Sequence, residues 1–289
     1  MTGLDALEVG IHLPQVGPAA SGESLQRAAV LAEELGFADV WVSDHLAIPT
    51  GVHYPPTAYI YEPLVAMTWV AAVTERGGLG TSMLVLPMRN PVVVAKMLAS
   101  LDRMSGGRVV LGTAAGWLEA EFKAVGVPFG ERGPRTDEAI EMLRTLWTED
   151  PITERFPVHG AQFESIRAKP QPARPIPIWI GGSVDVALRR AVRVGDGWHG
   201  AMVPPAQVEP IVKRLRAERP DPAFVISMRT PWDPQLDDPN SILDEVEGYT
   251  AAGVDHVVAH PRQRDAENYL RSMEQLASLC RRAGVRLRS

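Results

Sequence analysis

The sequence is poor in cysteine and has no long apolar run. Its 289 residues include one cysteine, Cys280, which cannot form an internal disulfide and which we expect to be a small buried side chain. No apolar stretch approaches the roughly 20 residues that a membrane-spanning helix needs. Residues 1–9 also lack the basic and apolar regions of an export signal. These absences predict a cytoplasmic protein with no membrane partner.

Clustered positive charge is absent too. The formal net charge is −6, and no group of lysines and arginines supplies the basic face that nucleic-acid binding requires. The arginines between 281 and 288 are explained as the solvated side of a last helix. The composition therefore predicts no nucleic-acid partner and favours a small-molecule ligand.

The loops that mark two common nucleotide-binding folds are missing. A doubly wound sheet would show G-x-G-x-x-G after its first strand, whereas the first apolar strand here runs into HLPQVG at 12–17. No G-x-x-x-x-G-K-[ST] loop is present either. Neither of these folds is expected.

What the sequence does contain is a repeated alternation of short apolar strands with amphipathic helices. Eight such units follow one another, and the length suits one closed barrel of about 250 residues with room for insertions. The prediction is an α/β fold, a (β/α)8 TIM barrel that forms a single domain over residues 1–289. The strands are expected at 9–13, 39–43, 79–86, 109–111, 178–180, 197–203, 224–228 and 256–259.

The alternation is interrupted after the fourth strand. Between residues 117 and 176 the sequence shows one helical pattern at 134–147, a small hairpin pattern at 158–163 and a proline-rich return from 169. This stretch is too short to bury a core of its own. We interpret it as an insertion between strand 4 and strand 5 of the barrel.

Polar and small residues gather where the first five strands end, which is the face that carries the chemistry in a TIM barrel. Histidine titrates near pH 6.5, so a histidine at such a strand end can give or take a proton. Two glycines and a serine that open a helix can present backbone N–H groups and a cap to a phosphate or carboxylate. The candidates are His12, Ser43-Asp44-His45, Ser82-Met83, Ala115-Gly116-Trp117 and Gly181-Gly182-Ser183.

These residues also allow plainer interpretations. Asp44-His45 could be a helix cap followed by a polar loop histidine, and Gly181-Gly182-Ser183 could be a tight turn with Ser183 as an ordinary cap. Histidines near several strand ends raise the alternative of a metal hydrolase. Barrel hydrolases with a metal pair usually show His-x-His on strand 1, however, and here His12 stands alone. No metal is therefore expected.

Five short motifs carry a resemblance to a known family: AEELGF at 32–37, WVSDHL at 41–46, LGTSM at 79–83, GGR at 106–108 and GG at 181–182. In this order and spacing, and over essentially the whole chain, they resemble the bacterial luciferase-like superfamily of flavin-dependent TIM barrels. The match is closest to the actinobacterial branch that uses the deazaflavin coenzyme F420. An insertion after strand 4 is also typical of that family.

The resemblance implies a coenzyme site. Asp44 and His45 would lie beside the coenzyme ring, as the catalytic pair, with His45 handling the proton. Ser82-Met83 would form a bulge in strand 3 with a non-prolyl cis peptide behind the central ring.

The resemblance also implies residues around the rest of the coenzyme. Ala115 and Gly116 would lie near its tail, and Gly181, Gly182 and Ser183 would donate to its phosphate. His12 and Trp117 complete the expected coenzyme-binding set.

The function implied is hydride transfer between F420 and a small organic substrate, in a homodimer that uses the apolar helix near 63–73. An FMN-dependent monooxygenase in the same fold is the alternative, and a non-catalytic flavin-binding relative is the alternative from another class. Sugar-phosphate dehydrogenases of the superfamily carry a glutamate directly after the strand-4 glycine. Trp117 occupies that position here, so a sugar phosphate is not the expected substrate.

Overall fold

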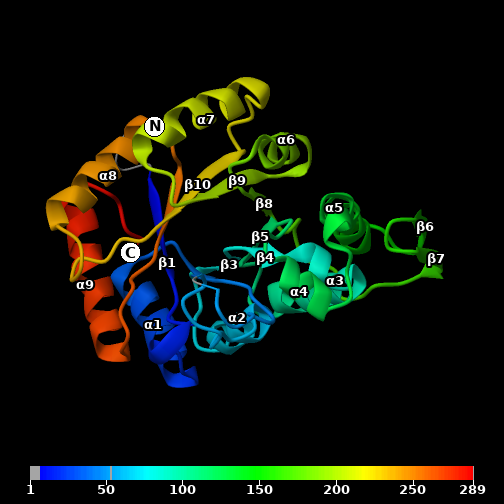
Figure 1. The fold of residues 1–289 in the computed structure, drawn as a ribbon, viewed down its shortest axis with the longest axis horizontal. Helices are drawn as coiled ribbons and strands as arrows, with labels where there is room; N and C mark the ends of the chain where they lie inside the picture. The colour runs from blue at the N-terminus through cyan, green and yellow to red at the C-terminus, as the bar shows by residue number, and fades with distance from the viewer. Residues whose placement is uncertain (1–6, 53, 289) are drawn as a thin grey trace.

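A computed structural model describes residues 7–52 and 54–288 and shows a closed barrel of parallel strands inside a ring of helices (Figure 1). The strands follow the order β3-β2-β1-β11-β10-β9-β8-β5, and pairing of β3 with β5 closes the ring. This confirms the predicted TIM barrel. The strands are β1 (Glu8–His12), β2 (Asp39–Val42), β3 (Gly78–Thr81), β4 (Leu84–Val85), β5 (Val109–Ala114), β8 (Ile178–Gly181), β9 (Gly197–Ala201), β10 (Val225–Thr230) and β11 (His256–Ala259).

The helices of the ring follow the strands in sequence, and their apolar faces pack onto the barrel. Their starts are typical: α1 begins after Ser21 in a capping box, and α3 begins after Asn90 with a proline in its first turn. None of the helices in the described residues is long and apolar enough to cross a membrane. They are α1 (Gly22–Leu35), α2 (Pro63–Ala71), α3 (Pro91–Met104), α5 (Arg132–Thr148), α6 (Asp185–Val194), α7 (Pro205–Glu218), α8 (Pro239–Ala251) and α9 (Ala266–Arg282).

Aromatic rings fill the inside of the barrel, and glycines on neighbouring strands make room for them. Trp41 stacks on His199 at 5.0 Å and on Trp179 at 5.3 Å between ring centroids. A Cβ atom on Gly80 would lie 2.4 Å from the Trp41 ring, so only glycine fits beside it. The inside of the barrel is therefore a packed core at these residues.

The third strand differs from the single run expected at 79–86. Leu79 pairs with Val109 and Leu84 with Thr113, so the chain uses one more residue on this strand than on β5 between the two pairs. That extra residue is a bulge, and the Ser82–Met83 peptide inside it is cis. The bulge and the cis bond implied by the resemblance are confirmed, and the strand continues as β4.

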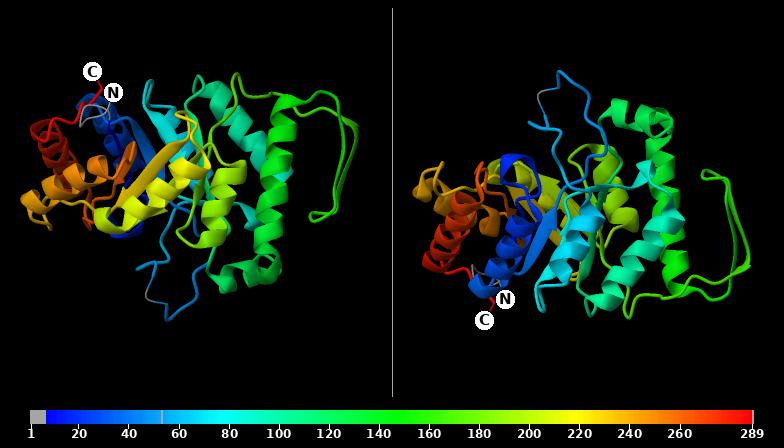
Figure 2. Two further views of the ribbon diagram at one scale, coloured as in Figure 1. Left: turned by 90° about the horizontal axis from the view of Figure 1, so that it is seen from above. Right: turned by 90° about the horizontal axis from the view of Figure 1, so that it is seen from below.

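The segment 117–176 adds three pieces to the alternation. A short helix α4 (Glu119–Ala124) follows β5, and α5 then takes a place in the ring between α3 and α6. The hairpin of β6 (Ile152–Phe156) and β7 (Ala161–Ile166) projects beyond α5 (Figures 1 and 2). The hairpin expected at 158–163 is wrong in extent, because most side chains of its strands are exposed and leave little apolar alternation to recognise.

Candidate active site

A cavity of about 1050 Å³ opens at the carboxyl ends of the barrel strands, where the chemistry of TIM barrels takes place. Its walls are predominantly apolar, with polar groups at a few points, which is typical of sites for small molecules. The loops after most of the strands contribute to it. Its lining includes Asp44, His45, Tyr54, Ser82, Met83, Val85, Gly116, Trp117, Glu121, Phe122, Met202, Arg229, His260, Arg262 and Arg264.

The structure brings together seven of the twelve residues that the sequence nominated. These seven line the cavity: Ser43, Asp44, His45, Ser82, Met83, Gly116 and Trp117. The other nominated residues lie outside its lining: His12, Ala115, Gly181, Gly182 and Ser183.

His45 forms a dyad with Glu121 of α4. The His45 Nδ1 atom lies 2.8 Å from Glu121 Oε2, and the second carboxylate oxygen accepts hydrogen bonds from the backbone N–H groups of Leu46 and Ala47. Burial acts to raise the pKa of Glu121, but these hydrogen bonds outweigh burial and hold the pKa below its usual value. An ionised Glu121 therefore holds Nδ1 protonated and leaves Nε2 free to exchange a proton.

Asp44 lines the cavity, but its carboxylate is hydrogen-bonded to other groups of the protein. It accepts two hydrogen bonds from the Arg89 guanidinium, at 2.7 and 3.2 Å, and one from the backbone N–H of Val85. Burial raises the pKa of Asp44, and the attraction of Arg89 offsets this only in part. Asp44 thereby joins the loop after β2 to strand β4 and holds the bulge in place.

A chain of hydrogen bonds runs from the cavity down through the barrel. Ser82 Oγ lies 2.8 Å from His199 Nε2, and His199 Nδ1 lies 2.7 Å from Ser227 Oγ. Ser227 Oγ lies 2.7 Å from His256 Nδ1, and His256 Nε2 lies 3.0 Å from the carboxylate of Asp39. The hydroxyl at the floor of the cavity is thus connected to a carboxylate in the interior.

The electrostatics of two groups in this chain are defined. Burial acts to raise the pKa of Asp39, but its contacts with His256 and Trp41 outweigh burial and hold the pKa below its usual value, so Asp39 is an acceptor. Burial, with help from nearby positive groups, keeps the pKa of His199 well below its usual value. A neutral imidazole has one donor and one acceptor nitrogen, and His199 uses them on Ser82 and Ser227.

His12 lies behind the cavity wall. Its Nε2 lies 2.8 Å from Ser43 Oγ, and its ring packs on His260 at 4.3 Å between centroids. Burial, with a smaller effect from Arg229, lowers the pKa of His12 to about 3. A neutral His12 can orient its neighbours but has no access to a ligand in the cavity.

The turn after β8 supports the wall from outside. A Cβ atom on Gly181 would lie 2.2 Å from Met83 Cε, so this glycine leaves space for the Met83 side chain. Trp198 is fully buried and donates to the carbonyl of Gly182. Ser183 is exposed and does not cap α6, because the helix begins one residue later, after Val184. The predicted serine cap is wrong.

Two site residues were not predicted from the sequence. Glu121 lies in a stretch treated as an insertion, although its place four residues after Trp117 in a short helix was a usable signal. Arg229 directly follows the strand expected at 224–228, and its burial could not be inferred from the sequence.

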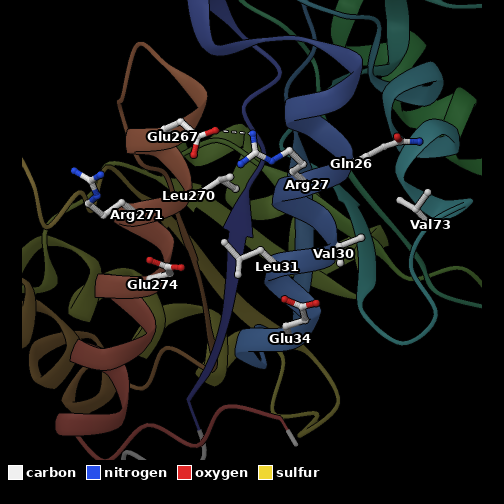
Figure 3. A pocket seen from close by; sticks show the side chains of 10 residues that line it. All are labelled: Gln26, Arg27, Val30, Leu31, Glu34, Val73, Glu267, Leu270, Arg271 and Glu274. Atoms are coloured by element: carbon white, nitrogen blue, oxygen red, sulfur yellow. Dashed lines mark hydrogen bonds and ion pairs between the residues drawn. The ribbon is translucent and has the colours of Figure 1, made fainter.

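A second hollow, of about 610 Å³, lies on the outside of the barrel between α1 and α9 (Figure 3). Two charged side chains in its wall, Arg27 and Glu267, form an ion pair at 2.6 Å. It lies away from the strand ends, so we do not assign it a reaction. Within the described residues, no three potential metal ligands lie together.

Known proteins resemble this chain in sequence and in fold. Residues 8–283 match the family model described as luciferase-like monooxygenase. An F420-dependent glucose-6-phosphate dehydrogenase of Gordonia bronchialis is 28% identical over 332 aligned positions, which cover 90% of this chain and 94% of that protein.

Two solved structures share the fold. The monooxygenase RslO1 from Streptomyces bottropensis superposes with a TM-score of 0.78 at 22% identity, over 94% of this chain and 98% of that one. An F420-dependent secondary alcohol dehydrogenase, solved with an F420-acetone adduct, gives 0.78 at 19% identity over the same shares. With a family match over nearly its whole length and a barrel with the bulged third strand, the chain belongs to the luciferase-like monooxygenase family.

Proposed function

We propose that this protein is an oxidoreductase that transfers a hydride between coenzyme F420 and a small organic substrate. The observation that carries the proposal is the His45–Glu121 dyad on the wall of a large apolar cavity. Relatives named as F420-dependent enzymes support the choice of coenzyme. Trp117 in place of a glutamate after Gly116 argues against a sugar phosphate as the substrate.

The residues present fit a flat ring. Met83, Val85, Trp117 and Phe122 offer apolar wall, and the space of about 1050 Å³ exceeds what a substrate alone requires. Ser82 Oγ at the floor can accept a hydrogen bond from a ring N–H. When bound, the deazaflavin supplies the hydride chemistry, and the protein supplies orientation and protons.

The proton that accompanies the hydride is assigned to His45. Glu121 orients the ring through Nδ1, so Nε2 is the nitrogen that can donate or accept at the substrate. Trp117 and Tyr54 lie at the mouth with ring centroids 6.2 Å apart, where they can restrict water. Exclusion of water strengthens each of these electrostatic contacts.

Basic residues around the mouth suit an acidic coenzyme tail. Arg262 and Arg264 line the cavity, and Arg262 also pairs with Asp237. The basic residues Arg167, Lys169 and Arg174 do not line the cavity.

A competing function is FMN-dependent monooxygenation, which the likeness to RslO1 favours. Titration of the purified protein with F420 and, separately, with FMN distinguishes the two, with tryptophan fluorescence as the signal because Trp117 lines the cavity. Micromolar or tighter F420 binding with much weaker FMN binding supports the proposal. A preference for FMN would favour the monooxygenase function instead, and oxygen uptake would be the next assay. Binding of neither would contradict the site assignment.

We also propose a homodimer that forms through α2 and α3. Trp69 on α2 is 51% exposed, and Val65 on the same helix is 61% exposed. Val93 and Met97 on α3 are exposed as well, and contiguous exposed apolar side chains often mark protein interfaces. Light scattering should give twice the chain mass, and Val65→Asp should shift it toward the monomer. A monomeric wild-type protein at micromolar concentration would contradict this proposal.

A further inference from the structure

Arg229, the next-to-last residue of strand β10, is a buried cation without an anionic partner. Its side chain lines the cavity, and the residue is 7% exposed. Nη1 donates to Ser82 O at 2.9 Å and to Ser43 Oγ at 3.1 Å, and Nη2 donates to Tyr54 Oη at 3.3 Å. All three acceptors are neutral. In the described part of the chain, no carboxylate pairs with this guanidinium, and its buried Nε has no acceptor.

The other buried arginines show what such a cation normally requires. Arg190 pairs with Asp137 at 2.7 Å. Arg108 lies 3.9 Å from Glu33 and has acceptors for Nε and for both Nη atoms. A buried charge without a partner costs several kcal/mol. The burial of Arg229 is therefore explained if an anion comes from outside the chain.

The unused donors have the geometry of a carboxylate site. Nε–H and one N–H of Nη2 lie on the same edge of the planar guanidinium, and a carboxylate binds such an edge with both oxygens. Tyr54 accepts from Nη2 and keeps its own hydroxyl proton to donate to the same anion. This places a two-donor edge and a phenol at one point of the cavity wall.

His260, which lines the same cavity, has a buried Nδ1 without a partner among the described residues. Burial, together with His12, Arg229 and Arg262, holds the pKa of His260 well below its usual value, so its ring is neutral. Arg262 also lines the cavity but pairs with Asp237, so Arg229 is the buried cation that lacks an anionic partner. One buried positive charge without a partner suits a monoanion.

We propose that Arg229 and Tyr54 form a subsite for a carboxylate group of the substrate, so that the substrate class is an organic acid. The inference rests on the function proposed above and specifies its substrate. Because Arg229 also holds the carbonyl of Ser82, a carboxylate bound there lies beside the bulge of the third strand. An anionic group of the coenzyme would offer the same chemistry, and the experiment separates the two sources.

Calorimetric titration of the coenzyme-free protein with benzoate and with benzamide tests the subsite. The two probes share size and shape but differ in charge. Benzoate should bind at least about 10-fold more tightly, as expected for a charge-assisted contact with a buried guanidinium. Arg229→Gln should abolish the preference and Arg229→Lys should retain part of it. Arg190→Gln, which removes a buried arginine outside the cavity, should leave it unchanged.

A second titration in saturating F420 assigns the source of the anion. Unchanged benzoate affinity supports a substrate carboxylate, whereas competition would assign Arg229 to the coenzyme and overturn the substrate class. Equal affinities for benzoate and benzamide would overturn the subsite itself, and this comparison needs only the wild-type protein. If the protein prefers benzoate but does not bind F420, the subsite is supported and the proposed function is contradicted.

Discussion

His45 and Glu121 are 76 positions apart in the sequence and meet because the loop after β2 lies across α4. The carboxylate is 2% exposed and the imidazole 11% exposed, so solvent screens their attraction only weakly. Two backbone N–H groups hold the carboxylate from the other side. The dyad is consequently rigid, with one ring nitrogen left for chemistry.

Replacement of His45 by alanine should lower turnover by about 10² to 10⁴-fold, the usual contribution of a general acid or base. Coenzyme binding should persist, because the apolar wall is intact. Steady-state turnover and a coenzyme titration of the same preparation measure both effects. Unchanged turnover with the coenzyme bound would remove His45 from the mechanism.

Glu121→Gln should act through His45. The amide oxygen can still accept from Nδ1, but the negative charge beside the ring is lost. The value of kcat should therefore fall, with little change in KM. Glu119→Gln is the matched control, since Glu119 lies on the same helix and is exposed beside Lys123. An unchanged kcat for Glu121→Gln would assign Glu121 a structural role.

At the scale of elements, the third strand decides the shape of the cavity. Its bulge presents Ser82 and Met83 to the opening, Asp44 secures the backbone of β4, and Gly181 of β8 accommodates the Met83 side chain. Residues from three neighbouring elements thus fix the position of this wall of the cavity. A change in any of them should alter ligand binding before it unfolds the barrel.

Gly181→Ala tests this arrangement. The new Cβ would overlap the end of the Met83 side chain. This side chain is flexible and lines the cavity, so it should move toward the cavity. Overpacking of this kind costs about 1–3 kcal/mol. Coenzyme affinity should fall about 10-fold, and Met83→Ala in the same chain should restore most of it. Gly130→Ala is the control, because a methyl group at Gly130 would have no neighbouring atom within 4 Å. Fluorescence titration of the four proteins is decisive, and an unaffected Gly181→Ala affinity would contradict the role of Met83.

The elements themselves could largely be predicted, because each signal is local. Apolar runs gave the strands, and prolines or polar caps marked helix starts such as that of α3. Contacts between distant segments could not be read in this way. Arg229 meets Ser82 across 147 positions, and only the closed barrel brings them together. The exposure of Trp69 escaped prediction for a similar reason, since composition alone cannot tell a core tryptophan from one on an apolar surface.

At the scale of the whole molecule, the mouth of the barrel keeps several histidines neutral. Burial is the main cause, and Arg229 adds to it: the pKa of His12 is lowered to about 3, and those of His199 and His260 lie well below the usual value. In the unfolded chain each histidine titrates near pH 6.5. Between pH 6.5 and about 3 the unfolded chain therefore binds more protons than the folded one, and stability falls as the pH falls.

Denaturant unfolding at pH 7.5, 6.5 and 5.5 should show this dependence. Each of the three histidines lowers the free energy of unfolding by up to about 1.4 kcal/mol per pH unit below pH 6.5. Asp44 acts in the opposite direction, because its raised pKa lets the folded protein take up at most one proton before the unfolded chain does. The free energy of unfolding should thus be nearly constant above pH 7 and decline below 6.5. His260→Asn should reduce the slope of the free energy of unfolding against pH by the contribution of one histidine, since an amide fits beside His12 and does not titrate. A flat profile between pH 6.5 and 5.5 would mean that the histidines are charged in the folded protein, and Arg229 would then have further buried positive charges beside it.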